Sequence, residues 1–227
     1  MNLITIGLRR YYRAMQRKYP EILWYGDETR PEIALTFDDG PHPRDTPRVL
    51  ESLARHDVQA TFFLVGQAAE RHSDLVRQIH QSGHQTSIHC YRHTPLPLEP
   101  PITLRAQLEH TAGIIAQSCG VLSEAIQDVR PPYGLFNRRM LTQLSAWGYR
   151  LVMWNNIPPH WMQPLPWTIQ QTLDQARPGS VIVLHDGNGH GLNVAKVVDT
   201  IIPILKNRGY HFVTIESMQS RRAYATS

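Results

Sequence analysis

Short runs of β-branched and apolar residues alternate along the chain with longer stretches in which apolar positions recur every three or four residues. The short runs predict strands, and the amphipathic stretches predict helices. The predicted strands are residues 33–37, 60–65, 85–88, 128–130, 151–154, 180–184 and 212–215. The predicted helices are residues 46–56, 68–82, 103–119, 137–147, 168–176 and 194–207. This alternation predicts an α/β fold with parallel strands, and this many units in 227 residues favours a barrel over an open sheet.

Polar side chains follow four of the predicted strands at the point where each strand ends. These residues are Asp38 and Asp39, His89 and His93, Arg130, and His185 with Asp186. Because the carboxyl ends of parallel strands converge on one face of such a fold, we expect these side chains to build a common site.

His89 and His93 are spaced i, i+4, so both imidazoles can face one point if they lie on one helical turn. A carboxylate from elsewhere would complete a set of two nitrogens and one oxygen, which suits catalytic zinc or a related divalent ion. An isolated pair with this spacing is more often a polar helix face, but the acids Asp38 and Asp39 at a strand end favour a metal site. We assign Asp39 to the metal.

The remaining polar residues fit the hydrolysis of an amide. Asp38 is the candidate general base, because a carboxylate can complete the deprotonation of a water molecule activated by a metal. Arg130 would pair with Asp38 and hold it ionised. His185 is the candidate general acid, since the departing nitrogen needs a proton and histidine suits this task near neutral pH. A backbone N–H near Tyr133 would help to stabilise the oxyanion.

Composition and charge add little to this interpretation. The net charge is +4 and the pI is about 9.2, with basic residues near both ends. An anionic partner would be a lipid surface or a cell-wall polymer, and no nucleic acid is expected because no nucleic-acid-binding module accompanies the charge. Two cysteines, Cys90 and Cys119, form no disulfide framework.

The N-terminal region is predicted as a basic amphipathic segment covering residues 1–30. No clear signal peptide and no transmembrane helix is recognised, so the sequence alone predicts a cytoplasmic or membrane-peripheral protein. Residues 3–18 would form a helix that either packs on the domain or lies on a membrane, with peripheral contact through residues 1–25.

Four motifs, in this order, resemble those of the polysaccharide deacetylase family with the NodB homology domain (carbohydrate esterase family 4). They are Thr36-Phe37-Asp38-Asp39-Gly40, His89-Cys90-Tyr91-Arg92-His93, Arg130-Pro131-Pro132-Tyr133-Gly134 and Val183-Leu184-His185-Asp186. The resemblance covers residues 31–216, which we interpret as the deacetylase domain, and leaves residues 217–227 as a C-terminal tail. It implies a distorted (β/α)7-8 barrel, a divalent metal such as zinc or cobalt, and N-deacetylation of amino-sugar polymers.

The resemblance also implies the roles assigned above. Asp38 would be the base, His185 the acid and Arg130 the residue that orients Asp38. The implied metal ligands are Asp39, His89 and His93. Val183 matches an apolar position that helps to receive the acetyl methyl group.

The sequence departs from the family pattern in its fourth motif. This motif usually ends in an Asp-Trp pair, whose Asp orients the acid histidine and whose Trp lines the pocket. Trp161 is retained here, but His160 stands where the Asp is expected, and Asn156 replaces another common Asp. A neutral His160 would not raise the pKa of His185 as a carboxylate would, and Asp174 is an alternative source of that carboxylate. We therefore predict a lower pH optimum than in relatives with Asp, or a different acyl or sugar substrate.

The leading hypothesis is removal of N-acetyl groups from N-acetylglucosamine-type units of peptidoglycan, an exopolysaccharide or a chitin-like chain. Family analogy places such an enzyme at the cell envelope. The alternative within the enzyme class is a deacylase of a glycolipid or small amino-sugar conjugate, which the basic N-terminus suits better. The alternative outside it is a non-catalytic sugar-binding relative. The altered fourth motif favours that alternative, whereas the retention of Asp38, Arg130 and His185 argues against it.

Overall fold

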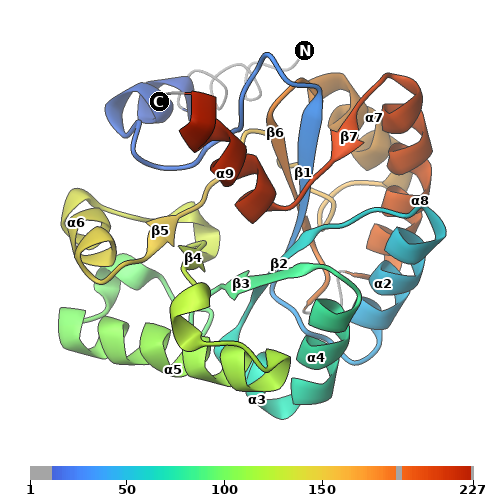
Figure 1. Ribbon diagram of the computed structural model, residues 1–227. Helices are drawn as coiled ribbons and strands as arrows, with labels where there is room; N and C mark the ends of the chain where they lie inside the picture. Colours follow the sequence, from blue (N-terminus) through green and yellow to red (C-terminus); the bar gives the residue numbers. More distant parts are fainter. Residues whose placement is uncertain (1–11, 188–190, 226–227) are drawn as a thin grey trace.

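The computed structural model describes residues 12–187 and 191–225 (Figure 1). The strands are β1 (Glu32–Asp38), β2 (Thr61–Leu64), β3 (Gln85–Ile88), β4 (Asp128–Val129), β5 (Arg150–Leu151), β6 (Ser180–His185) and β7 (His211–Phe212). The helices are α2 (Asp45–Arg55), α3 (Gly66–Arg71), α4 (Ser73–Gln81), α5 (Pro101–Cys119), α6 (Arg138–Ala146), α7 (Leu165–Gln175), α8 (Gly191–Asn207) and α9 (Ile215–Ala225). Three short 3-10 helices are η1 (Leu96–Leu98), η2 (Ser123–Ala125) and η3 (Pro132–Gly134).

The strands form one parallel sheet in the order β5-β4-β3-β2-β1-β6, and β7 pairs with the beginning of β1. The sheet curls, and an isolated parallel bridge between Asn156 and Ile182 joins the segment after β5 to β6. The helices lie around the outside of the curled sheet (Figure 1). The fold is thus the distorted α/β barrel that the sequence predicts.

Burial of the central strands explains their sequences. All seven residues of β1 are buried, as expected for a parallel strand that is covered on both faces. Inside the sheet, the rings of Phe37 and Phe62 stack with their centroids 4.9 Å apart. The apolar faces of the surrounding helices complete one continuous core, so the polar residues at the carboxyl ends of the strands rest on a rigid base.

Several predicted elements differ from the structure. The predicted strand over residues 212–215 ends at Phe212, and Ile215 begins helix α9. The predicted helix over residues 68–82 is divided into α3 and α4, because His72 leaves the helical region at φ −130° and ψ 47°. The predicted strand over residues 151–154 is shorter, because the chain changes neighbours there. Val152 bridges to Leu23, and Asn156 then bridges to Ile182.

Residues near both ends of the described chain pack against the core. Residues 12–18 are helical, and Leu23 and Trp24 are buried. The backbone of Leu23 exchanges hydrogen bonds with Leu151 and Met153 at 3.1 and 2.8 Å. In α9, Met218 is buried in the same cluster. These segments therefore stabilise the barrel.

Residues 1–11, which form much of the segment predicted to contact a membrane, lie outside the described residues. In the ranges that the structure does describe, no helix is both long enough and apolar enough to cross a membrane.

Candidate metal and catalytic site

The two adjacent aspartates diverge at the end of β1. Asp38 is the last strand residue, whereas Asp39 has a φ of 73°, in the left-handed region. This change of direction sends the two carboxylates to different partners. It also requires close backbone packing: a Cβ on Gly187 would lie 2.2 Å from the carbonyl oxygen of Asp39, so only glycine fits beside this turn.

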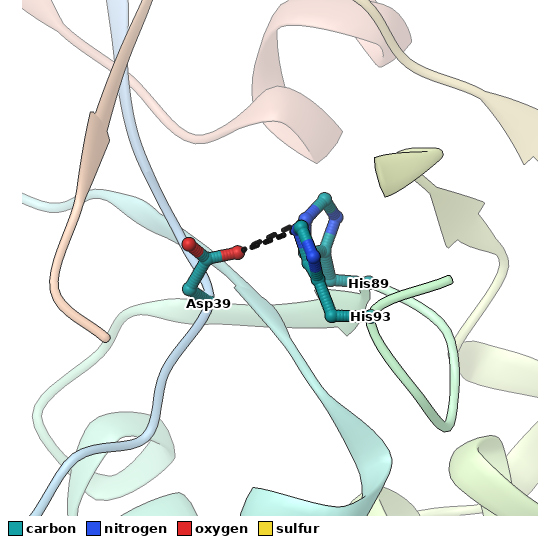
Figure 2. A group of neighbouring side chains, drawn as sticks. All are labelled: Asp39, His89 and His93. Carbon is teal, nitrogen blue, oxygen red and sulfur yellow. Dashed lines mark ion pairs between the residues drawn. The ribbon is translucent and has the colours of Figure 1, made fainter. Parts of the chain in front are cut away.

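Asp39, His89 and His93 converge on one point (Figure 2). Oδ1 of Asp39 lies 3.3 Å from Nε2 of His89 and 3.1 Å from Nε2 of His93. The three donor atoms lie within 4.8 Å of one another. The predicted helical turn for the two histidines is wrong. They lie in a loop after β3 in which Cys90 has a φ of 65°, and the loop brings the imidazoles together.

This group fits a divalent cation. Nδ1 of His89 donates to the carbonyl oxygen of Arg130 at 2.8 Å, which leaves Nε2 with a lone pair directed at Asp39. Burial opposes ionisation of Asp39, but the adjacent histidines outweigh it and hold the pKa of this carboxyl well below its usual range. Burial likewise opposes protonation of His89, but Asp38 and Asp39 outweigh it and raise its pKa. The three donor atoms thus favour a positive charge between them, and one oxygen with two imidazole nitrogens suits zinc and related ions.

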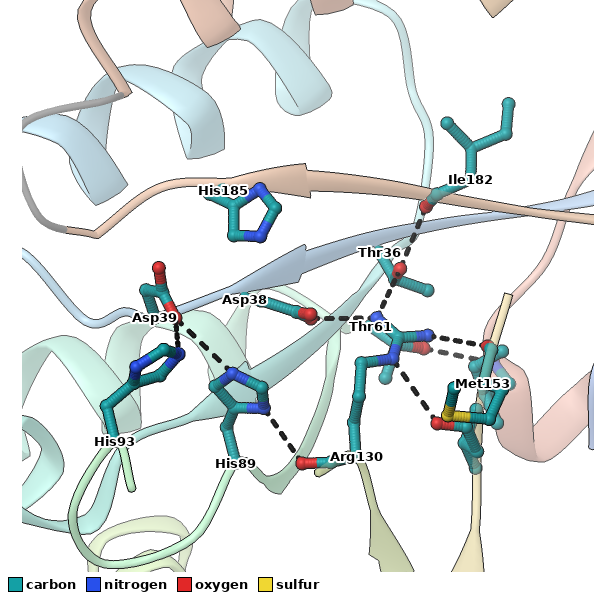
Figure 3. A network of polar contacts seen from close by, with 12 residues as sticks. Thr36, Asp38, Asp39, Thr61, His89, His93, Arg130, Met153, Ile182 and His185 are labelled. Carbon is teal, nitrogen blue, oxygen red and sulfur yellow. Dashed lines mark hydrogen bonds and ion pairs between the residues drawn. The ribbon is translucent and has the colours of Figure 1, made fainter. Parts of the chain in front are cut away.

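Arg130 holds Asp38 in place from the interior of the barrel (Figure 3). Its Nη1 donates to Oδ1 of Asp38 and to Oγ1 of Thr36, both at 2.7 Å. Its other nitrogens donate to the carbonyl oxygens of Val152 and Met153 at 3.4 and 3.2 Å. The guanidinium is fully buried, so burial lowers its pKa and the charge of Asp38 only partly offsets this. A buried, hydrogen-bonded charge pair fixes the carboxylate rigidly.

His185 lies across from both aspartates, at the end of β6 (Figure 3). It pairs in register with Asp38. Burial lowers the pKa of His185, and the charges of Asp38 and Asp39 only partly offset this. Its buried Nδ1 has no hydrogen-bond partner among the described residues.

His160 and Trp161 lie against His185. The ring centroids are 4.9 Å apart for His160 and 5.1 Å apart for Trp161. Nδ1 of His160 donates to the carbonyl oxygen of Pro158 at 3.1 Å, and its Nε2 accepts the backbone N–H of His185 at 3.2 Å. These two bonds define a neutral tautomer. The residue at the altered motif position thus supports the backbone of His185 and leaves its Nδ1 unbound.

Asp174 does not supply the missing carboxylate, which contradicts that prediction. It lies on the exposed face of α7, where it accepts a hydrogen bond from Gln170 at 2.7 Å. Asn156 has a structural role. It is buried, it forms the bridge to Ile182 that closes the barrel, and its side chain donates to the carbonyl oxygen of Thr172 at 3.0 Å.

Tyr133 and Val183 flank the group on two sides. Tyr133, with a φ of 59°, packs its exposed ring edge-on against His93 at a centroid distance of 4.6 Å. Val183 is buried two residues before His185 on β6, so both side chains lie on the same face of the strand.

Asp186 and Thr46 are two contributors whose contacts the sequence analysis did not predict. Asp186 is fully buried, and Oγ1 of Thr46 donates to its carboxylate. Burial raises the pKa of Asp186 to about 7. The backbone N–H of Asp186 donates to the carbonyl oxygen of Asp38 at 3.1 Å, so this cluster connects β6 to the turn that carries Asp39. The position of Asp186 directly after His185 was the available signal.

Comparison with known proteins identifies the family of this chain. The sequence profile of the family described as "Polysaccharide deacetylase" matches residues 25–152. The chain belongs to the polysaccharide deacetylase family. It is 36% identical over 195 residues to a peptidoglycan-N-acetylglucosamine deacetylase of Bacillus cereus, covering 85% of this chain and 70% of that protein. It is 31% identical over 195 residues to a chitooligosaccharide deacetylase of Azorhizobium caulinodans, covering 81% of this chain and 92% of that protein.

Solved structures of the same family share the fold. The Bc1960 peptidoglycan N-acetylglucosamine deacetylase has a TM-score of 0.83 at 34% identity, covering 87% of this chain and 92% of that chain. A mutant of BA3943, a family pseudoenzyme with restored enzymatic activity, has a TM-score of 0.78 at 25% identity, covering 86% and 70%. Because the family includes a pseudoenzyme, activity has to be argued from the residues of the site.

Proposed function

We propose that this polysaccharide deacetylase is a metal-dependent hydrolase that removes N-acetyl groups from N-acetylglucosamine-type units of a glycan. Peptidoglycan, an exopolysaccharide and a chitin-like chain are the candidate polymers, and the peptidoglycan and chitooligosaccharide relatives support this substrate class. The proposal depends most on one observation: the Asp39–His89–His93 group lies beside both a fixed carboxylate, Asp38, and a buried imidazole, His185.

Asp39, His89 and His93 are the proposed ligands of the metal, with zinc as the expected ion and cobalt as a substitute. A divalent cation held there supplies a Lewis acid for the amide carbonyl and lowers the pKa of an adjacent water molecule. The hydrogen bond from His89 to the carbonyl oxygen of Arg130 fixes the ligand ring in the orientation that this task needs.

Asp38 and His185 divide the proton transfers. Asp38, fixed by Arg130, accepts the proton of the attacking water. His185 in its protonated form donates a proton to the departing amide nitrogen, which turns a poor leaving group into a neutral amine. Because burial lowers the pKa of His185, its protonated form is a stronger acid than an exposed imidazolium.

The remaining site residues receive the acetyl group. Val183 and Trp161, both beside His185, form an apolar wall suited to a methyl group. The backbone N–H of Tyr133, next to His93, is the proposed donor to the oxyanion.

A non-catalytic sugar-binding function is the second candidate, and one observation favours it. Nδ1 of His185 is buried without a hydrogen-bond partner in the part of the chain that is described, so the acid lacks the orienting carboxylate expected in the family. The intact base and metal group favour catalysis.

The test is acetate release from N-acetylglucosamine oligomers by protein that has been stripped of metal and resupplied with Zn²⁺ or Co²⁺. We expect release that depends on the metal and disappears in Asp38→Asn, while that variant still binds metal in a direct titration. A wild-type protein that binds metal but releases no acetate would contradict the proposal for these substrates. It would favour a glycolipid, a small conjugate or a binding function.

A further inference from the structure

Large apolar side chains are exposed at one end of the barrel. Among the described residues, the exposed large hydrophobic side chains include Leu98 (80% exposed), Ile102 (82%) and Met162 (74%), with Leu135 and Trp167 about half exposed. Each of these five lies in a segment that leads from the carboxyl end of a strand into the next helix. Such segments of a parallel sheet lie at the same end, so the five residues surround the end that carries the metal and catalytic group. We call these five residues the apolar rim.

The rim is held by rigid backbone. Leu98 lies in η1 and Ile102 in the first turn of α5, and the prolines Pro95, Pro97, Pro100 and Pro101 fix the backbone between and beside them. Leu96, next to them, is buried and anchors this loop to the core. Met162 and Trp167 lie in a second proline-rich segment, which leads into α7. These side chains therefore remain presented to solvent and cannot collapse onto the protein at low cost.

Exposed arginines accompany the rim. Arg92 lies in the loop after β3 and Arg139 in the first turn of α6, and neither forms an ion pair with another described residue. Of the acidic groups nearby, Asp45 is buried between Arg44 and His42, and Glu99 is half-buried and accepts a hydrogen bond from Thr94 while keeping its charge. Two exposed arginines beside one half-buried carboxylate leave a net positive charge beside the rim.

We infer that the apolar rim docks on the surface of an anionic lipid bilayer. Aliphatic and Trp side chains that enter the boundary between headgroups and acyl chains, next to unpaired arginines, are the combination that binds such a surface. Docking of this end turns the metal and catalytic group toward the bilayer. If the proposed function holds, the amino sugar is presented at the membrane surface.

Leu122 provides a matched control. It is 77% exposed, like the rim residues, but it lies between α5 and β4, where the chain returns to the amino end of a strand. A serine there removes one leucine that is as exposed as each of the substituted rim residues, but from the opposite end of the barrel. The rim variant is Leu98→Ser/Ile102→Ser/Met162→Ser, which changes only highly exposed side chains and none of the proposed catalytic or metal-binding residues.

The experiment is flotation of the full-length chain with vesicles of phosphatidylcholine alone or mixed with phosphatidylglycerol, at low and high salt. We expect binding to the phosphatidylglycerol vesicles, weakened by salt, a loss of at least about tenfold in the rim variant, and no loss in Leu122→Ser. Residues 1–11 are identical in all three proteins, so they cannot account for the difference.

Other outcomes overturn the inference. Absent wild-type binding, or a rim variant that binds like wild type, would exclude this surface. A rim variant that elutes as a smaller species than wild type would show that the rim joins copies of the chain. An equal fall in acetate release from water-soluble oligomers would show that the rim contacts the glycan instead. Flotation is measured without substrate, so its failure and the failure of the proposed function are distinguishable.

Discussion

Position 160 allows the charge next to the proposed acid to be changed without altering a metal ligand. The ring centroids of His160 and His185 are 4.9 Å apart, and Nε2 of His160 accepts the backbone N–H of His185, which requires the lone pair of a neutral ring. The substitution His160→Asp replaces this neutral ring with a carboxylate. At an effective dielectric constant of about 20, two unit charges at that separation interact by about 3 kcal/mol, which corresponds to roughly 2 pH units.

The sign of the effect follows from the role of His185. An acid must be protonated, so activity falls as the pH rises through the pKa of His185, which burial lowers. A carboxylate at position 160 stabilises the imidazolium and raises that pKa. We expect the alkaline limb of the kcat/KM profile to move upward by about 1 to 2 pH units in His160→Asp, measured as acetate release by the metal-saturated enzyme.

His160→Asn is the matched control, because it is neutral and still offers an oxygen that can accept the backbone N–H of His185. It should leave the alkaline limb where wild type has it. If His160→Asp and His160→Asn gave the same limb as wild type, charge at this position would not act on His185. The interpretation of the altered fourth motif would then be refuted.

Three further predictions concern stability and metal binding. Arg130→Met leaves a buried carboxylate without its partner and should lower the free energy of unfolding in urea by about 3–5 kcal/mol. The double variant Arg130→Met/Asp38→Asn should lose clearly less than the sum of the losses of the two single variants. Additive losses would contradict the pairing of Arg130 with Asp38. Burial lowers the pKa of His84 to about 4, so the stability that its neutral form contributes is present above about pH 6.5 and is lost as the pH falls toward 4. His84→Asn should flatten the acid side of the unfolding profile, and an unchanged slope would refute this assignment. Gly187→Ala should weaken Zn²⁺ binding at least about tenfold by displacing Asp39, whereas Gly113→Ala, with open space around its Cβ, should not.

The fold was predictable because the alternation of strands and helices can be read from short stretches of sequence and has one common topology, a parallel sheet covered by helices. The boundaries were less predictable where tertiary contacts decide them. The segment after β5 leaves β4 and bridges to β6 at Asn156, and no local pattern records that exchange of neighbours. The burial of Leu23 and Trp24 was missed for the same reason, because it depends on pairing with a segment far away in the chain.

The residues of the site were predictable from the sequence, but their arrangement in space was predictable only in part. Spacing indicated that His89 and His93 act together, but the left-handed Cys90 that brings them together in a loop has no reliable signal in one sequence. Asp174 was considered because it is acidic and close in sequence to β6. Its helix turns it toward solvent, and helix orientation depends on packing that spacing alone does not give.

The site consists of two parts that are held differently. The metal and base part is fixed by charged hydrogen bonds from a fully buried arginine and by a carbonyl bond to a ligand histidine. The acid part is held by ring packing and by one backbone bond from His185 to His160, with Nδ1 of His185 unbound among the described residues. Changes at position 160 should therefore alter the pH dependence of turnover while leaving metal affinity unchanged. The two parts can thus be tested separately. A His160→Asp variant that lost metal affinity would instead show that the two parts are coupled through β6 and the Asp186–Thr46 contact.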